Sequence, residues 1–266
     1  MNRVEQAFSD AREQNRGVLI PYLCPFDPSE DTLERLAPAL ERAGAGIIEI
    51  GVPYSDPIAD GPVIAAAMHR ALQRGATPER IFEQVSRVRG AVGCGLVAMC
   101  SVSIVQAIGI DAFVSRSKDA GFDGFIFPDA PVDESDELVA ATRGAGLTCS
   151  LLVSPTTPAD RAARIASACT GFVYLLARAG ITGERSDAPD VAERVALLRE
   201  HTDTPIAAGF GISTAEHVRA VVGQADGAIV GSALVRRLHE AAERGGDPIA
   251  EAEAFARELA GGLDRG

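Results

Sequence analysis

The sequence predicts an α/β fold in which eight parallel strands alternate with helices. Short apolar runs recur along the 266 residues, and none of them shows the alternation of apolar and polar residues that marks a half-solvated antiparallel strand. The eight runs are 18–23, 46–51, 95–99, 124–127, 148–153, 171–176, 205–208 and 227–230. Because strands buried on both faces are typical of parallel sheets, and eight is the count at which such a sheet closes, we expect a TIM (β/α)8 barrel.

Amphipathic segments that carry helix start signals fill the intervals between the strands. Typical N-cap residues or a proline suited to the first helical turn begin three of them, namely Asp31 before 32–45, Thr77-Pro78 before 79–89 and Ser213-Thr214 before 215–222. The long interval between the second and third strands has room for two helices, 63–74 and 77–89, and an extra helix precedes the first strand. No linker interrupts the chain, so we expect one domain over 1–266; a doubly wound open sheet is the alternative.

Charge and hydropathy argue against two classes of partner. The formal net charge is −12, whereas proteins that bind nucleic acids or membrane surfaces in general need a basic footprint. The longest apolar stretch, 93–110, is interrupted by polar residues and is better explained by a buried strand with its loop than by a membrane span. The first 17 residues lack the apolar core of a secretory signal. We therefore expect that the protein binds neither nucleic acid nor a membrane.

The numbers and spacing of the cysteines, histidines and lysines limit the kinds of catalytic site that the chain can form. The five cysteines are odd in number, widely spaced and without a C-x-x-C pair, which predicts free thiols in a reducing compartment such as the cytoplasm. The four histidines have no carboxylate or cysteine at metal-ligand spacing, so we expect no metal and no cofactor. Lys118 is the only lysine, and no G-x-S-x-G elbow indicates a nucleophilic serine.

Two carboxylates in the second β-α unit are the candidate catalytic pair. Glu49 lies among β-branched apolar residues of a predicted strand, where an ionised acid would be costly to bury unless it is used or satisfied. Asp60 follows on a proline-rich loop, and loops at strand ends carry the catalytic residues of barrel enzymes. A structural explanation stays open for each acid: Glu49 could pair with an arginine in the core, and Asp60 before Gly61-Pro62 could be a turn former.

Glycine-rich segments follow the last three strands and predict a phosphate site. They are GITG at 180–183, GFGIS at 209–213 and the pair Gly231-Ser232, which opens a helical run. In barrel enzymes such loops and a helix N-terminus bind phosphate through backbone N–H groups, and glycine permits close approach. For any one of these glycines alone, ending a strand is as good an explanation as binding phosphate.

Two tyrosines and one aspartate are further candidates. Tyr22 in the first strand and Tyr174 in the sixth could line a pocket for an aromatic ligand, although a core position is an equal explanation. Asp129 ends the fourth strand and either positions that loop or forms a turn.

Five segments, IEIGVPYSDPIADGP, GFDGFIFPDAPVDE, GFVYLLARAGITG, AAGFGIS and GAIVGSALV, resemble the tryptophan synthase α subunit family in order and spacing over nearly the whole chain. The resemblance implies a lyase that cleaves indole-3-glycerol phosphate to indole and glyceraldehyde 3-phosphate by a retro-aldol reaction, within a heterotetramer with β subunits. It implies a general acid/base at Glu49 and a second essential acid at Asp60. It also implies phosphate contacts at Gly183, Gly211, Gly231 and Ser232, and a substrate contact at Thr182 in the loop after the sixth strand.

The chain departs from the family pattern after the first and third strands. Cys24-Pro25-Phe26 replaces the usual threonine and glycine before Asp27-Pro28, and MCSVSIVQAIGID replaces a segment of the form M-x-Y-x-N. Cys100 stands where an aromatic residue is expected, so we expect it at a changed wall of the substrate pocket. In the family this segment also helps contact the β subunit.

The sequence leaves three other functions open. The altered third-strand segment is compatible with a free-standing lyase that supplies indole, or a related compound, to a specialised pathway. A barrel that has lost activity and acts as an allosteric subunit is a second alternative, against which the presence of Glu49 and Asp60 counts. A phosphate-sugar isomerase on the same fold is a third, although the chain lacks the lysine or histidine that such enzymes often use.

Overall fold

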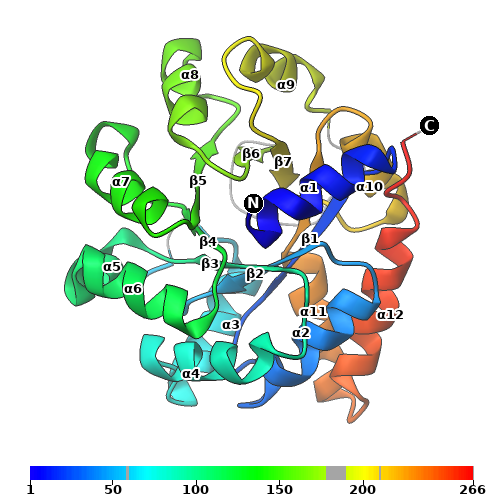
Figure 1. Ribbon diagram of the computed structural model, residues 1–266. Helices are drawn as coiled ribbons and strands as arrows, with labels where there is room; N and C mark the ends of the chain where they lie inside the picture. Colours follow the sequence, from blue (N-terminus) through cyan, green and yellow to red (C-terminus); the bar gives the residue numbers. More distant parts are fainter. Residues whose placement is uncertain (58–59, 178–189, 210, 266) are drawn as a thin grey trace.

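The strands form a closed barrel (Figure 1). The computed structural model describes residues 1–57, 60–177, 190–209 and 211–265. The strands are β1 (Val18–Leu23), β2 (Ile47–Gly51), β3 (Gly95–Met99), β4 (Gly124–Phe127), β5 (Thr148–Val153), β6 (Val173–Leu176), β7 (Ile206–Gly209) and β8 (Gly227–Val230). Each pairs in parallel with its neighbours in chain order, and β1 pairs with β8. The predicted TIM barrel is confirmed and the open sheet is wrong, because β1 to β8 pairing leaves no free edge.

Helices surround the barrel (Figure 1). They are α1 (Arg3–Glu13), α2 (Thr32–Arg42), α3 (Pro62–Gln73), α4 (Pro78–Arg89), α5 (Val102–Ile108), α6 (Ile110–Ala120), α7 (Asp136–Gly144), α8 (Ala159–Ala168), α9 (Ala192–Arg199), α10 (Ala215–Val222), α11 (Ser232–Glu243) and α12 (Pro248–Ala260), with a 3-10 turn at Val132–Glu134. The predicted extra helix before the first strand is α1, and the two predicted after the second are α3 and α4.

Helix α1 lies across the end of the barrel at which the strands begin (Figure 1). Asn2 caps it, accepting the N–H groups of Val4 and Glu5, and the Glu5 carboxylate accepts the Asn2 N–H in return. Val4 and Phe8 are its buried residues, and they pack toward the first residues of β3 and β8. The helix therefore closes this end of the barrel, and the opposite end, where the strands finish, is left for a site.

The strand register identifies the side chains that share a face with Glu49. Partners on neighbouring parallel strands point to the same side, and Glu49 pairs with Tyr22 on β1 and Val97 on β3. Burial, and after it the charge of Glu49, raises the pKa of Tyr174 on β6, which lies across the barrel from β2. Because only the barrel interior brings these two strands within electrostatic reach of each other, Glu49, Tyr22 and Tyr174 point inward.

All five cysteines are free thiols, as the sequence predicted, and the structure shows all of them buried. Burial raises the pKa of each, so the thiols stay protonated near neutral pH. Within the described ranges, no helix combines the length and apolar character needed to cross a membrane.

Candidate active site

Glu49 is a buried acid without a hydrogen-bonding partner on one of its oxygens. Its residue is 1% exposed, and its Oε2 atom accepts no hydrogen bond from any described residue. Burial raises the pKa of Glu49 from its usual value of 4.5 to about 8, and the neighbouring charge of Asp60 adds to this rise. The arginine partner that a structural explanation would require is therefore not found among the described residues. An acid in this condition carries its proton at neutral pH and is able to donate it.

Asp60 stands on the loop that leads from β2 into α3. Its N–H donates to the carbonyl of Pro57 at 3.1 Å, and Gly61 and Pro62 follow as the N-cap and first residue of α3. Asp60 thus lies at a bend that leads into α3. Its carboxyl is nevertheless half-buried, and burial followed by the charge of Asp129 raises its pKa to about 6. The same residue thus leads into α3 and presents an acid with a raised pKa.

The two acids are held at different protonation states near neutral pH. With a pKa of about 8, Glu49 is mostly protonated, whereas Asp60, with a pKa of about 6, is mostly ionised. Two titratable groups whose surroundings separate their pKa values are the usual arrangement for one proton donor and one charged stabiliser. The pair titrates as a unit, because the Asp60 charge is one cause of the raised pKa of Glu49.

Asp129 ties together the loops that follow β3 and β4. Its Oδ2 accepts the Ser101 hydroxyl at 2.6 Å, and its Oδ1 accepts the N–H of Val102, the first residue of α5, at 2.9 Å. Both explanations that the sequence allowed for Asp129 hold, because it lies in a turn after β4 and its bonds position the loop after β3. Its charge also reaches Asp60, so the fourth strand contributes to the electrostatics of the acid pair.

Both inward tyrosines extend over glycines at the ends of neighbouring strands. A Cβ added at Gly51, at the end of β2, would collide with the Tyr22 hydroxyl oxygen. A Cβ added at Gly209, at the end of β7, would lie 2.8 Å from the hydroxyl oxygen of Tyr174. Each phenol therefore occupies space that a side chain would otherwise fill, and both tyrosines form part of the inner wall.

The predicted phosphate residues fall partly within the described chain. Gly211, with φ +77, follows β7, and Gly231 is the N-cap of α11, whose first residue is Ser232. Strands β7 and β8 are paired through Gly209 and Ile229, so these segments leave the barrel side by side. Gly183 and Thr182 lie outside the described residues.

The N-terminus of α11 differs from that of its neighbour α10. Thr214 caps α10, its hydroxyl oxygen accepting the His217 N–H at 3.1 Å. No side chain of the described residues caps α11, which begins after Gly231. The first N–H groups of a helix carry partial positive charge and attract anions when no side chain accepts them. The geometry of α11 is therefore suited to a phosphate group.

Cys100 directly follows β3 and is 1% exposed. Its N–H donates to the Ile126 carbonyl at 3.0 Å, and its thiol lies 3.5 Å from the carbonyl oxygen of Ser101. The residue before it, Met99, pairs with Gly51 and so shares the inward face of Glu49. Sequence reasoning missed Met99, although counting two residues on from Val97, the register partner of Glu49, would identify it once the pairing is known.

A buried ion pair joins the loop after β1 to α3 and was also missed. Asp27 is 4% exposed, and its two carboxylate oxygens accept from Nε and Nη2 of Arg70 at 2.7 Å each. Arg74 adds a longer contact of 3.5 Å. The Asp27 carboxylate in turn raises the pKa of Arg70. Because α3 begins at Pro62, two residues after Asp60, this bidentate pair helps fix the loop that carries the second acid.

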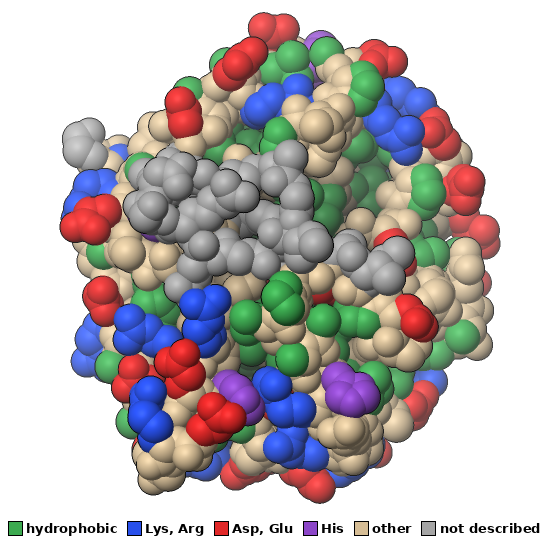
Figure 2. All heavy atoms as spheres, turned by 180° about the vertical axis from the view of Figure 1, so that it is seen from behind, with side chains coloured by type: hydrophobic (Ala, Val, Ile, Leu, Met, Phe, Trp, Pro, Cys, Tyr) green, Lys and Arg blue, Asp and Glu red, His purple; other side chains and the backbone are tan. Residues whose placement is uncertain are grey.

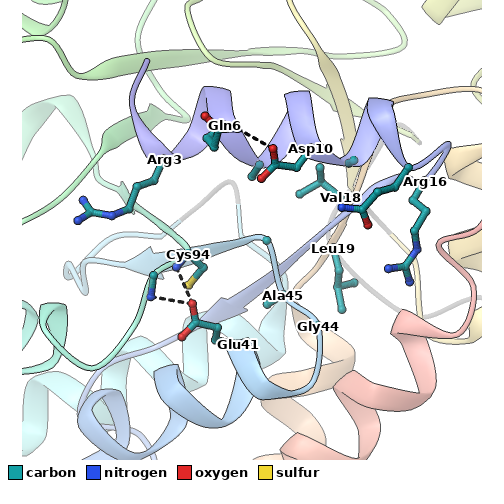
Figure 3. A pocket seen from close by; sticks show the side chains of 15 residues that line it. Arg3, Gln6, Asp10, Arg16, Val18, Leu19, Glu41, Gly44, Ala45 and Cys94 are labelled. Atoms are coloured by element: carbon teal, nitrogen blue, oxygen red, sulfur yellow. Dashed lines mark hydrogen bonds between the residues drawn. The ribbon is translucent and has the colours of Figure 1, made fainter.

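The face at which the strands end differs from the opposite end of the molecule. Seen from that side, hydrophobic side chains lie near the centre and charged side chains gather around the periphery (Figure 2). At the other end, a hollow of about 300 Å³ lies between α1, β1 and the segment before β3 (Figure 3). Its lining includes neither Glu49 nor Asp60, and its Glu41 carboxylate already accepts the N–H groups of Gly93 and Cys94 at 2.7 Å each.

Comparison with known proteins agrees with this geometry. The family model described as tryptophan synthase alpha chain matches residues 8–263. The tryptophan synthase alpha chain of Opitutus terrae is 44% identical over 241 residues, which cover 90% of this chain and 91% of the relative. That of Halorhodospira halophila is 45% identical over 242 residues, covering 90% and 89%.

Solved structures give the same result. A chain of Mycobacterium tuberculosis tryptophan synthase superposes with a TM-score of 0.90 at 35% identity, covering 100% of this chain and 99% of that one. The tryptophan synthase subunit alpha of Legionella pneumophila superposes with a TM-score of 0.89 at 30% identity, covering 99% of each. With its barrel, its acid pair and these matches over nearly its full length, the chain belongs to the tryptophan synthase alpha chain family.

Proposed function

We propose that this protein is the α subunit of a tryptophan synthase and cleaves indole-3-glycerol phosphate to indole and glyceraldehyde 3-phosphate. The observation that carries the proposal is the pair of acids from one β-α unit, Glu49 with a pKa of about 8 and Asp60 with a pKa of about 6, in a chain of this family. A protonated acid and an ionised acid are what cleavage of the carbon-carbon bond needs.

Glu49 moves the protons. It donates its proton to C3 of the indole ring, which makes the ring an electron acceptor. The resulting carboxylate then removes the proton of the adjacent side-chain hydroxyl while the bond from C3 to the side chain breaks. The bonding electrons return to the ring to give indole, and the hydroxyl oxygen becomes the carbonyl oxygen of the aldehyde. Glu49 ends the cycle protonated, as it began.

Asp60 stabilises the charged intermediate. When C3 is protonated, the ring nitrogen becomes cationic and its N–H becomes a stronger donor. An ionised carboxylate that accepts this N–H lowers the energy of the intermediate by charge that is in place beforehand. The pKa of about 6 keeps Asp60 ionised at neutral pH, as this function requires.

In this proposal, the segments after β6, β7 and β8 bind the phosphate group of the substrate. Gly211, Gly231 and the uncapped N-terminus of α11 at Ser232 support it. Gly183 belongs to the same proposed set, and Thr182 to the loop after β6. Tyr22, Tyr174 and Cys100 are proposed as walls of the substrate pocket.

The proposed partner is a tryptophan synthase β subunit, and the proposed compartment is the cytoplasm. Relatives over nearly the whole chain are tryptophan synthase alpha chains, which supports the partner. The free, buried thiols of all five cysteines support a reducing compartment. The altered sequence after β3 supports one alternative function, that of a free-standing lyase that releases indole without a β subunit.

An indole-release assay tests the proposal. Purified protein is incubated with indole-3-glycerol phosphate, alone and with a β subunit, beside the variants Glu49→Gln, Asp60→Asn and Glu137→Gln. We expect release by the wild type and by Glu137→Gln, whose side chain is exposed on α7, and loss of release in the two acid variants. Release that does not change when a β subunit is added would support the free-standing lyase. No indole from the wild type under either condition contradicts the proposal.

A further inference from the structure

The phenol of Tyr22 is a buried polar group that the acid pair and the phosphate segments do not use. The residue is 3% exposed, and its hydroxyl oxygen has no nitrogen or oxygen partner among the described residues, where only the Cys24 thiol approaches it. A buried hydroxyl without a partner is costly, so a native structure that keeps one usually has a use for it. Phenylalanine would fill the same space without this cost, and the hydroxyl therefore needs an explanation of its own.

The side chain of Tyr22 spans the mouth of the barrel from β8 to β2. At its base, a Cβ added at Gly231 would lie 3.7 Å from the Cβ of Tyr22. At its tip, the hydroxyl oxygen occupies the space over Gly51 into which a side chain would project. Gly51 lies two residues beyond Glu49 on β2 and therefore shares its face. The ring thus begins beside the proposed phosphate segment and ends one step above the proton donor.

The hydroxyl is available as a hydrogen-bond donor. Burial, with smaller contributions from Cys24, Asp60 and Glu49, raises the pKa of Tyr22 well above its usual value, so the phenol keeps its proton. The Cys24 thiol also interacts with the hydroxyl, but sulfur is a weak acceptor and leaves the donor largely unsatisfied. What the hydroxyl lacks is a strong oxygen acceptor.

The proposed substrate carries two side-chain hydroxyls between the indole ring and the phosphate-bearing carbon. The phosphate lies toward Gly231, at the base of the ring, and the indole N–H is itself a donor that Asp60 is proposed to accept. Of the two side-chain hydroxyls, only the one next to C3 loses its proton, so it must face Glu49, which shares a face with Gly51 and lies one step below the Tyr22 hydroxyl. We propose that the Tyr22 hydroxyl donates a hydrogen bond to this substrate oxygen; this inference rests on the proposed function.

Such a bond is a contact with the reacting atoms. As the hydroxyl loses its proton and becomes the aldehyde carbonyl, its oxygen passes through a state with increased negative charge. A fixed donor that is already pointed at this oxygen stabilises that state more than the ground state. Removing one neutral hydrogen bond of this kind is expected to lower kcat/KM by about tenfold.

The first test compares wild type with Tyr22→Phe, which removes only the hydroxyl. We expect kcat/KM for indole release to fall about tenfold. In the absence of substrate, we expect the melting temperature to stay the same or to rise, because an unsatisfied buried polar atom is removed. An unchanged kcat/KM in a folded Tyr22→Phe protein overturns the inference and leaves the proposed function in place. A wild type that releases no indole contradicts the proposed function itself.

The second test measures binding without turnover. In the Glu49→Gln background, dissociation constants are measured with Tyr22 and with Tyr22→Phe for two ligands. One is indole-3-glycerol phosphate, and the other is the analogue that lacks only the hydroxyl next to C3. We expect Tyr22→Phe to weaken binding of the first ligand several-fold and to leave the second unchanged. An equal effect on both ligands, or no effect on either, overturns the inference, because the contact would then not be with the hydroxyl oxygen.

Discussion

Replacing Glu49 by glutamine is predicted to stabilise the protein while it abolishes catalysis, and to do so in a manner that depends on pH. Glu49 has a pKa of about 8 in the folded protein against a usual value of 4.5. Below pH 4.5 the acid is protonated in both the folded and the unfolded chain, and it contributes no difference. As pH rises from 4.5 to 8, the unfolded chain loses its proton and the folded chain keeps it, so the wild type loses stability. Above pH 8 the loss is complete.

The size of this effect follows from the separation of the two pKa values. At about 1.4 kcal/mol per pKa unit, ionised Glu49 costs the folded state on the order of 5 kcal/mol. Between pH 5 and pH 8 the loss is on the order of 3 to 4 kcal/mol. Glutamine has nearly the same shape and does not ionise, so the variant avoids this loss. The effect is a large fraction of the free energy of unfolding of a typical domain, about 5 to 15 kcal/mol.

Urea unfolding at pH 5 and pH 8 measures the effect. Wild type, Glu49→Gln and Glu137→Gln are compared, because the last changes an exposed glutamate on α7 in the same chemical way. We expect Glu49→Gln to be nearly as stable as the wild type at pH 5 and clearly more stable at pH 8, and Glu137→Gln to follow the wild type at both. A stability difference between Glu49→Gln and wild type that does not change with pH would refute the raised pKa, and with it the assignment of Glu49 as a proton donor.

Three further predictions concern activity. A plot of kcat/KM against pH should be bell-shaped, falling below about 6 as Asp60 is protonated and above about 8 as Glu49 loses its proton; a rate that stays constant from pH 5 to pH 9 would contradict this. Asp129→Asn removes a negative charge that raises the pKa of Asp60, so the acid limb should move to lower pH, whereas Asp136→Asn on α7 should leave it in place; an unmoved limb in both variants would show that Asp129 does not act on Asp60. Ser232→Asp places a negative charge at the first residue of α11 and should raise the KM for the phosphorylated substrate at least about tenfold, with weaker inhibition by inorganic phosphate. If neither the KM nor the inhibition constant of inorganic phosphate changes, the phosphate group binds elsewhere.

Much of the barrel could be predicted from the sequence because burial on both faces leaves a simple signal. Runs such as Val18–Leu23 are apolar throughout, and the structure buries every residue of that strand. Helix starts were also predictable where a capping residue and proline coincide, as at Thr77 and Pro78, where α4 begins. The strand ends were less certain: the run 171–176 is a strand only from Val173 to Leu176. Boundaries depend on hydrogen bonds to neighbouring strands, which the local sequence does not contain.

The acid pair was foreseeable for a different reason. Glu49 is conspicuous because an acid inside an apolar strand must be explained, and the structure shows it buried with an unpartnered oxygen. The contacts that position the site were not foreseeable. The bonds from Ser101 to Asp129 and from Arg70 to Asp27 join residues 28 and 43 positions apart, and only the closed barrel brings their elements together. The value of about 6 for the pKa of Asp60 likewise depends on burial and then on Asp129, which follows β4, whereas Asp60 follows β2.

Transfer of a proton from Glu49 to C3 of the indole ring is the step on which the account depends. The direct measurement is indole release in D2O, with the isotope at C3 of the product read by mass spectrometry or proton NMR, for the wild type and for Glu49→Gln. We expect the wild-type protein to release indole that carries one deuterium at C3. We expect the Glu49→Gln variant to release no indole. Release of C3-deuterated indole by Glu49→Gln at the wild-type rate would contradict the account.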